Sequence, residues 1–124
     1  MRTSKHFKEY EWVCNCGCGM SNISEKLLSM LDDARDVAGI PFLLSSGCRC
    51  YDHNRDEGGT ATSSHTSTTR TAGTAVDISI TSSHSRFKIL HALIIAGFTR
   101  VGIARTFIHV DIDAGKPAEV SWIY

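Results

Sequence analysis

The sequence predicts an α+β fold in which helices pack on a small antiparallel sheet. Two segments are expected to be helices, one of them with apolar residues at helical spacing, and several short segments alternate apolar and polar residues as strands do. Helices and strands do not alternate regularly along the chain, and two strands lie close enough to form a hairpin, which favours an antiparallel sheet. With 124 residues, the chain is expected to form one domain, residues 1–124.

The two predicted helices have recognisable ends. The first is expected over residues 24–38, because Ser24 is a residue type that caps helix N-termini and Gly39 is a common C-terminal stop. The second is expected over residues 85–97, where Gly97 acts as the stop. Residues Leu27, Leu31, Ala34 and Ala38 of the first helix recur at helical spacing, so this helix has an apolar face that can pack on a sheet.

Two segments with strand periodicity have a polar face of unusual composition. Residues 74–80 and residues 106–112 each place apolar side chains on one face, as a half-buried strand does. The other face presents Asp77 in the first strand and His109 in the second. Each strand therefore offers a side chain that can bind a metal.

Three further strands and one loop complete the predicted sheet. Strands are expected at residues 42–44, at residues 99–103 and in the tail, residues 119–124. A tight connection at Ala104 and Arg105 joins the second of these to the following strand. Residues 51–74 are rich in glycine, serine and threonine, so they are expected to be mostly loop.

Bulk composition restricts the function classes. The formal net charge is zero, which argues against nucleic acid as a partner, because such partners usually require a basic surface. No apolar run has the length of a membrane span, so membrane insertion is not expected. The first twelve residues lack the apolar stretch of a signal peptide, and we therefore expect synthesis and retention in the cytoplasm.

His65, Asp77 and His109 form a candidate metal site. One carboxylate and two imidazoles are a common ligand set for catalytic zinc, which keeps a fourth position for water. Each residue also has an ordinary interpretation, as a solvated loop histidine, a strand-edge carboxylate and a partly buried histidine. No local HExxH-type motif decides between the two interpretations.

The segment SGCRCYDHNRDEGGTATSSHTSTTRTAGTAVDI resembles the signature of the M15 zinc peptidases, relatives of the D-alanyl-D-alanine carboxypeptidases and of the hedgehog fold. The family pattern reads SGxR, HN, GG, SxHxxGxAxD and a later HxD or HxH strand. The opening HFKEYEWVCNCGCG is similar to the compact phage and prophage branch. The matching elements are Ser46–Arg49, His53–Asn54, Gly58–Gly59, Ser63–His65, Gly73–Asp77 and His109–Asp111.

The resemblance implies a hedgehog/DD-peptidase-like fold and a set of roles. By position, His65, Asp77 and His109 would be the zinc ligands, Arg49 would face the substrate, and Ser63 would support the His65 loop and the substrate. The implied activity is zinc-dependent hydrolysis of peptide bonds in bacterial peptidoglycan, as a carboxypeptidase or an endopeptidase. We expect a monomer that acts on a stem peptide, in phage or prophage lysis after release from the cytoplasm or in cell-wall remodelling.

Two departures from the family pattern affect this expectation. The insertion at residues 66–72 lengthens the histidine–aspartate spacing, and a displaced His65 would remove the metal site. Thr106 stands where many relatives carry the general base. Asp111 is the nearest replacement, with orientation of an imidazole as its alternative role, and Glu57 is the next candidate base. A catalytically inactive, zinc-containing binding module of the hedgehog-like fold is the alternative function.

Five cysteines form two clusters, CNCGCG and GCRC. In a reducing cytoplasm such clusters are more often thiols or metal ligands than disulfides. Four thiolates suffice for a second, structural zinc ion, but the C-x-C spacing differs from the C-x₂-C of zinc ribbons, and ordinary thiols are the alternative. A cysteine-rich module that binds nucleic acid is disfavoured by the zero net charge. The cysteines are Cys14, Cys16, Cys18, Cys48 and Cys50.

Overall fold

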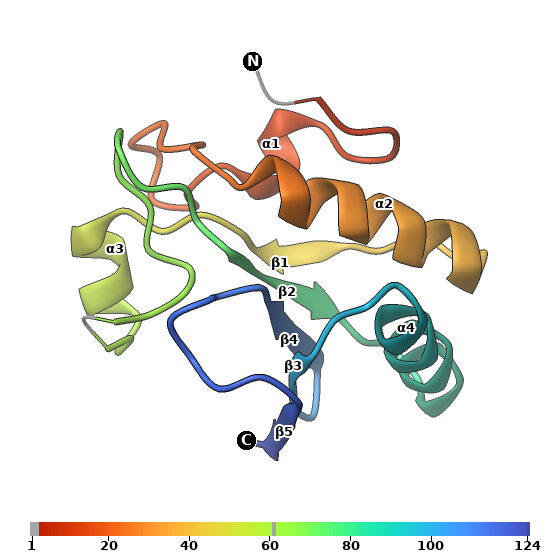
Figure 1. The fold of residues 1–124 in the computed structure, drawn as a ribbon. Coiled ribbons are helices and arrows are strands. Elements are labelled where there is room, and N and C mark those ends of the chain that lie inside the picture. The colour runs from red at the N-terminus through yellow and green to blue at the C-terminus, as the bar shows by residue number, and fades with distance from the viewer. Residues whose placement is uncertain (1–2, 61) are drawn as a thin grey trace.

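A five-stranded sheet organises the chain in the computed structural model, which describes residues 3–60 and 62–124 (Figure 1). Its strands lie in the order β1-β2-β4-β3-β5, and three of the four pairings are antiparallel. The strand at the β5 edge is parallel to β3, so the sheet is mixed. The α+β class is confirmed. The strands are β1 (Leu44–Ser46), β2 (Ala75–Ser79), β3 (Arg100–Ile103), β4 (Phe107–Asp111) and β5 (Val120–Ile123).

The parallel pairing follows from the path of the chain. Strands β3 and β4 form the expected hairpin, and the loop 112–119 then carries the chain back past the far side of β3. Since β5 runs opposite to β4, it runs in the same direction as β3. The predicted tail strand is therefore present, but it completes the sheet next to β3.

Four helices accompany the sheet, and none in the described part of the chain is long and apolar enough to cross a membrane. The Ser24 hydroxyl accepts a hydrogen bond from the backbone N–H of Leu27, and Gly39 has φ +68°, so the predicted ends of α2 are confirmed. The helices are α1 (Glu9–Trp12), α2 (Glu25–Ala38), α3 (Tyr51–Asp56) and α4 (Ser83–Ile95).

Three local predictions differ from the structure. Helix α4 begins two residues early, because Ser82 and Ser85 form a capping box at its start. The first strand was expected at residues 42–44 but lies at Leu44–Ser46, because these are the residues whose backbone pairs with β2. The strand therefore ends in two serines and not in the apolar run. The expected loop contains α3, whose N-cap is Cys50, a residue type that gives little helix-start signal.

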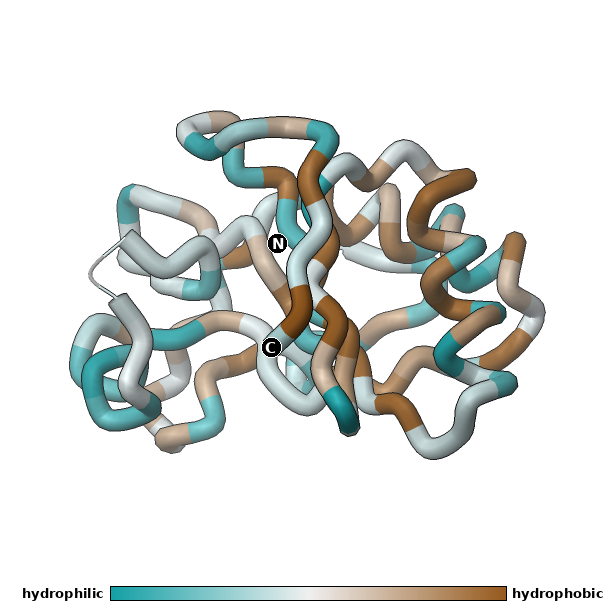
Figure 2. The backbone as a smooth tube through the Cα atoms, turned by 90° about the horizontal axis from the view of Figure 1, so that it is seen from below, coloured by the Kyte–Doolittle hydropathy of each residue, from teal (hydrophilic) through white to brown (hydrophobic). Residues whose placement is uncertain are grey.

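The core lies between one face of the sheet and the helices. Val76, Ile78, Ile108 and Val110 are fully buried and pair across β2 and β4, and they join one apolar cluster with the buried sides of α2 and α4. Burial of each such side chain contributes about 1.5–3 kcal/mol. Figure 2 shows hydrophobic segments concentrated around the strands and the helical side, while the side with α3 and the loops is mostly hydrophilic.

The opposite face of the sheet carries a row of residues that crosses all five strands. Strand pairing places Asp77 beside His109, and His109 beside Gly102. The row begins at Ser46 on β1 and ends at Trp122 on β5. Because the apolar face packs on the core, this row on the opposite face is where the sheet can carry a candidate functional site.

Candidate metal centre

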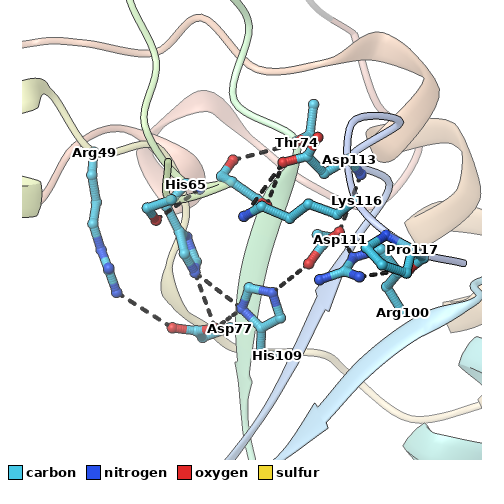
Figure 3. Close-up of polar contacts among 12 residues, drawn as sticks. Arg49, His65, Thr74, Asp77, Arg100, His109, Asp111, Asp113, Lys116 and Pro117 are labelled. Carbon is cyan, nitrogen blue, oxygen red and sulfur yellow. Dashed lines mark hydrogen bonds and ion pairs between the residues drawn. The ribbon is translucent and has the colours of Figure 1, made fainter. Parts of the chain in front are cut away.

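Three predicted ligands meet above the middle of this row. The Asp77 Oδ1 atom lies 3.0 Å from His109 Nδ1 and 3.2 Å from His65 Nε2, and the two imidazole nitrogens are 3.3 Å apart (Figure 3). The register of β2 and β4 positions Asp77 and His109, whereas His65 arrives from the loop before β2. All three side chains are buried.

The donor atoms fit a tetrahedral zinc ion. With bonds of about 2.0–2.1 Å, the ligands of tetrahedral zinc lie about 3.3 Å from one another. The three separations in the structure, 3.0, 3.2 and 3.3 Å, are close to that value. Two imidazoles and one carboxylate are also a donor set that zinc accepts, with one position left for water.

Hydrogen bonds fix the tautomers of both histidines. His65 Nδ1 donates to the carbonyl oxygen of Gly47 at 2.9 Å, which leaves the Nε2 lone pair facing the other ligands. His109 Nε2 donates to Asp111 Oδ2 at 2.7 Å, which leaves its Nδ1 lone pair on the same side. Both rings are thus oriented for metal binding by the nitrogen that does not face the metal position.

The electrostatics of the site favour ionised carboxylates. Burial raises the pKa of Asp77, but the adjacent imidazoles of His109 and His65, which donate to this carboxylate when they are protonated, outweigh burial and hold the pKa well below its usual range. Burial likewise raises the pKa of Asp111, and hydrogen bonds from His109, the Asp113 backbone and Arg100 lower it further than burial raises it. Both groups therefore remain anionic, as binding of a divalent cation requires.

Asp111 is enclosed by its partners. Its Oδ2 accepts from His109, and its Oδ1 accepts from Arg100 Nε at 2.7 Å and from the backbone N–H of Asp113 at 3.1 Å. Its exposed fraction is 1%. Both oxygens are engaged on the side of His109 that faces away from the other two ligands.

Arg49 lies on the opposite side of the centre. Its Nη2 is 3.6 Å from Asp77 Oδ2, and its Nε donates to the Ser46 hydroxyl at 3.2 Å. The Arg49 backbone pairs with the loop of the first histidine, donating to the His65 carbonyl oxygen at 2.9 Å. The SGCR segment and the SSH segment are therefore held together by backbone hydrogen bonds.

The insertion does not displace His65. Residues 66–72 form a turn in which Thr68 and Thr71 pair, and the turn docks on the segment before α2 through a bond from the Asn22 side chain to the Thr68 carbonyl oxygen. Ser67, within this turn, is buried. None of residues 66–72 lines the cavity beside the three ligands, and His65 Nε2 lies 3.2 Å from Asp77 Oδ1.

A cleft of about 390 Å³ opens beside the three ligands. Glu57 and Ser63 lie along it, and Ser63 Oγ accepts a hydrogen bond from the His65 backbone N–H at 3.3 Å. Thr106 is not among the lining residues and sits in the β3–β4 connection. The other lining residues are Arg49, Gly58, Gly59, Thr60, Ser64, His65, Asp77, Arg100, Phe107, His109, Asp111, Lys116, Trp122 and Tyr124.

Sequence reasoning did not identify the residues that β3 and β5 contribute. Arg100 bonds to Asp111 and stacks on Trp122, and the Trp122 ring lies 5.5 Å from the His109 ring, centre to centre. Gly102 permits this arrangement, because a Cβ atom there would lie 2.5 Å from Trp122 Nε1. In the sequence, an alternating tail and an arginine at the start of a strand give little indication of a functional site. Only the pairing of β5 with β3 brings Trp122 and Arg100 to the three ligands.

Comparison with known proteins agrees with the geometry. A family model described as Peptidase M15 matches residues 5–113. No curated protein sequence gives a significant match. The matched region includes His65, Asp77 and His109, which could hold a metal ion together, and the Arg49 segment. The chain therefore belongs to the M15 peptidase family, whose members are zinc-dependent.

Proposed function

We propose that the protein hydrolyses a peptide bond of bacterial peptidoglycan with one zinc ion held by His65, Asp77 and His109. The observation that carries the proposal is the triangle of donor atoms, 3.0–3.3 Å on a side, next to an open cleft. The chemistry that zinc supplies when bound there is Lewis-acid polarisation of the scissile carbonyl and a water whose pKa falls to about 7.

Asp111 is proposed to orient a metal ligand, and Arg49 is proposed to bind the substrate. We assign Asp111 the orienting role, because both of its oxygens are engaged and it bonds to the far nitrogen of His109. The Arg49 Nη2 atom is 3.6 Å from Asp77 Oδ2, which is too long for a strong hydrogen bond, and Arg49 lines the cleft. Its guanidinium can therefore bind a substrate carboxylate or a developing oxyanion through two N–H groups.

Glu57 is the proposed general base. Three carboxylates are among the described residues that line the cleft, namely Glu57, Asp77 and Asp111. Asp77 is a proposed ligand and Asp111 is enclosed, whereas Glu57 is exposed and its only described ion pair is with His53 at 3.8 Å. The Glu57 carboxylate would take a proton from the attacking water and pass it to the leaving amine.

The substrate class rests on charge and on family membership. Peptidoglycan stem peptides carry several carboxylates, and the cleft offers the cationic side chains of Arg49, Arg100 and Lys116. Carboxypeptidase and endopeptidase action both fit an open cleft of this size. We favour a role in phage or prophage lysis, or in wall remodelling, because the N-terminal segment resembles the compact phage branch.

Digestion of purified peptidoglycan tests the proposal. The wild type should release muropeptides that mass spectrometry identifies by the bond cut, chelator should abolish release, and added zinc should restore it. His109→Ala should neither hold this zinc nor cleave, while His84→Ala, at an exposed histidine on α4, should behave as wild type. Binding to peptidoglycan without any release would support the inactive binding module instead.

A further inference from the structure

Four cysteine sulfurs converge at a second place in the molecule. The Sγ atoms of Cys14, Cys16, Cys18 and Cys50 all lie within 4.8 Å of one another. Cys14 Sγ is 3.4 Å from Cys16 Sγ, and Cys16 Sγ is 3.7 Å from Cys50 Sγ. Three of these residues come from the loop between α1 and α2, and the fourth is the N-cap of α3.

The separations match a tetrahedron of sulfur ligands. A zinc ion with Zn–S bonds of about 2.3 Å has ligand atoms about 3.8 Å apart. A disulfide would require two of the sulfurs at about 2.05 Å. Distances of 3.4 and 3.7 Å therefore fit ligands around one ion better than bonded pairs.

Glycines explain why the unusual C-x-C spacing works. Gly17 and Gly19 both have φ +86°, a conformation that other residues rarely adopt, and each follows a cysteine directly. The resulting turns direct the sulfurs of alternate residues to one side. A hydrogen bond of 2.8 Å from the Cys14 N–H to the Met20 carbonyl oxygen closes the loop.

Backbone N–H groups point at three of the four sulfurs. The Met20 N–H donates to Cys18 Sγ at 3.4 Å, the Cys50 N–H to Cys14 Sγ at 3.4 Å, and the His53 N–H to Cys50 Sγ at 3.3 Å. Such donors orient sulfur ligands and stabilise their thiolate form. Cys16 and Cys18 are exposed, so apolar burial does not explain why they converge.

We propose that Cys14, Cys16, Cys18 and Cys50 bind a structural zinc ion. All four tetrahedral positions are filled by protein, so the site has no place for a reacting water and is separate from the proposed catalytic centre. It fastens the N-terminal loop to Cys50, the residue between Arg49 and α3. The fifth cysteine, Cys48, is buried in the apolar core and is not part of the cluster.

Metal content of variants tests the site apart from activity. The wild type should hold about two zinc ions per chain, and Cys16→Ser and His109→Ala should each lose one. Their double variant should hold none. Cys48→Ala is the matched control and should retain both ions. Since His109→Ala leaves the cysteines intact, loss of the catalytic metal and loss of the structural metal are distinguished.

Two measurements that need no cysteine variant guard against a variant that fails to fold. Cobalt substitution should give the intense thiolate-to-metal absorption of a tetrahedral sulfur site, and it should persist in His109→Ala. The exposed thiols of Cys16 and Cys18 should resist alkylation until a strong chelator is added. A single zinc that disappears entirely in His109→Ala, iron at the cysteines, disulfides in freshly purified protein, or thiols that react fully without chelator would each overturn the proposal.

Discussion

Individual side chains at the metal centre divide into those that face the metal position and those that hold them there. The His109 ring shows the division most clearly, because Nδ1 faces Asp77 and Nε2 bonds to Asp111. Asp111 is held in turn by Arg100. A role assigned to any one of these residues therefore makes a specific prediction about metal affinity or turnover.

Asp111→Asn should weaken zinc binding while leaving chemistry at saturating zinc nearly intact. The amide loses the charge that orients His109, and loss of such a partner typically costs ten- to a hundredfold in metal affinity. Titration of the variant's activity with zinc measures the effect. Unchanged zinc affinity with about a hundredfold lower turnover would instead identify Asp111 as the base.

Glu57→Gln should retain zinc and lose about a hundredfold or more in turnover, because the amide cannot accept the proton of the attacking water. Asp56→Asn, an exposed neighbour outside the cleft, is the control and should be fully active. Steady-state rates at saturating zinc decide the question. Normal turnover of the glutamine variant would remove Glu57 from the mechanism.

Arg49→Ala should reduce kcat/KM about thirty- to a thousandfold, which corresponds to a charge-assisted contact of about 2–4 kcal/mol. Arg49→Lys keeps the positive charge but loses the paired N–H donors of the guanidinium, so it should recover only part of the lost kcat/KM. Thermal midpoints should differ little among the three proteins, since Arg49 is outside the apolar core. A normal kcat/KM in the alanine variant would contradict the substrate-facing role.

At the scale of elements, the row of residues across the five strands brings β5 next to the ligands. Strand β5 is distant from β2 in the chain, yet it contributes a side chain that packs on His109. Gly102 lies between His109 on β4 and Trp122 on β5, and its missing side chain makes room for the indole. The Trp122 ring then covers His109 on the side away from Asp77 and stacks with Arg100. The edge strand thereby forms one wall of the cleft.

Gly102→Ala should displace Trp122 and impair substrate processing. The added Cβ would lie 2.5 Å from Trp122 Nε1, so the indole must move, and overpacking of this kind costs about 1–3 kcal/mol of stability. We expect a changed tryptophan emission, a lower thermal midpoint and a reduced kcat/KM. Gly115→Ala, where the nearest atom is 3.4 Å away, is the control. Unaltered emission and kinetics would show that Trp122 does not wall the cleft.

For the whole molecule, the proposed metal binding would be linked to folding. The three ligands come from β2, β4 and the loop before β2, so only the folded chain presents them together. Zinc at about 100 times its dissociation constant should raise the free energy of unfolding by about 2.7 kcal/mol, or the melting temperature by about 10 °C. Calorimetry with and without chelator measures this, and His109→Ala should show a smaller shift. Equal shifts in both proteins would mean that the His65, Asp77 and His109 centre does not stabilise the fold.

Much of the local structure was predictable because its causes are local. Ser24 and Gly39 mark the ends of α2 through their own capping chemistry, and alternation in β2 and β4 separates a core face from a polar face. Helix α3 was missed, because its cap is Cys50 and Tyr51 is its only large apolar residue. Short helices of this kind have too few apolar positions for periodicity to reveal them.

The sequence by itself determined the α+β class, the family and the three residue types offered to a metal, because periodicity, turn residues and ordered motifs are properties of short segments. Only the tertiary structure decided the register that pairs Asp77 with His109, the closure of the 66–72 insertion away from the cleft, and the partners of Asp111. It also brought Cys50 to the CNCGCG loop. These contacts join residues far apart in the chain, and their geometry depends on strand order and loop closure, which no local pattern encodes.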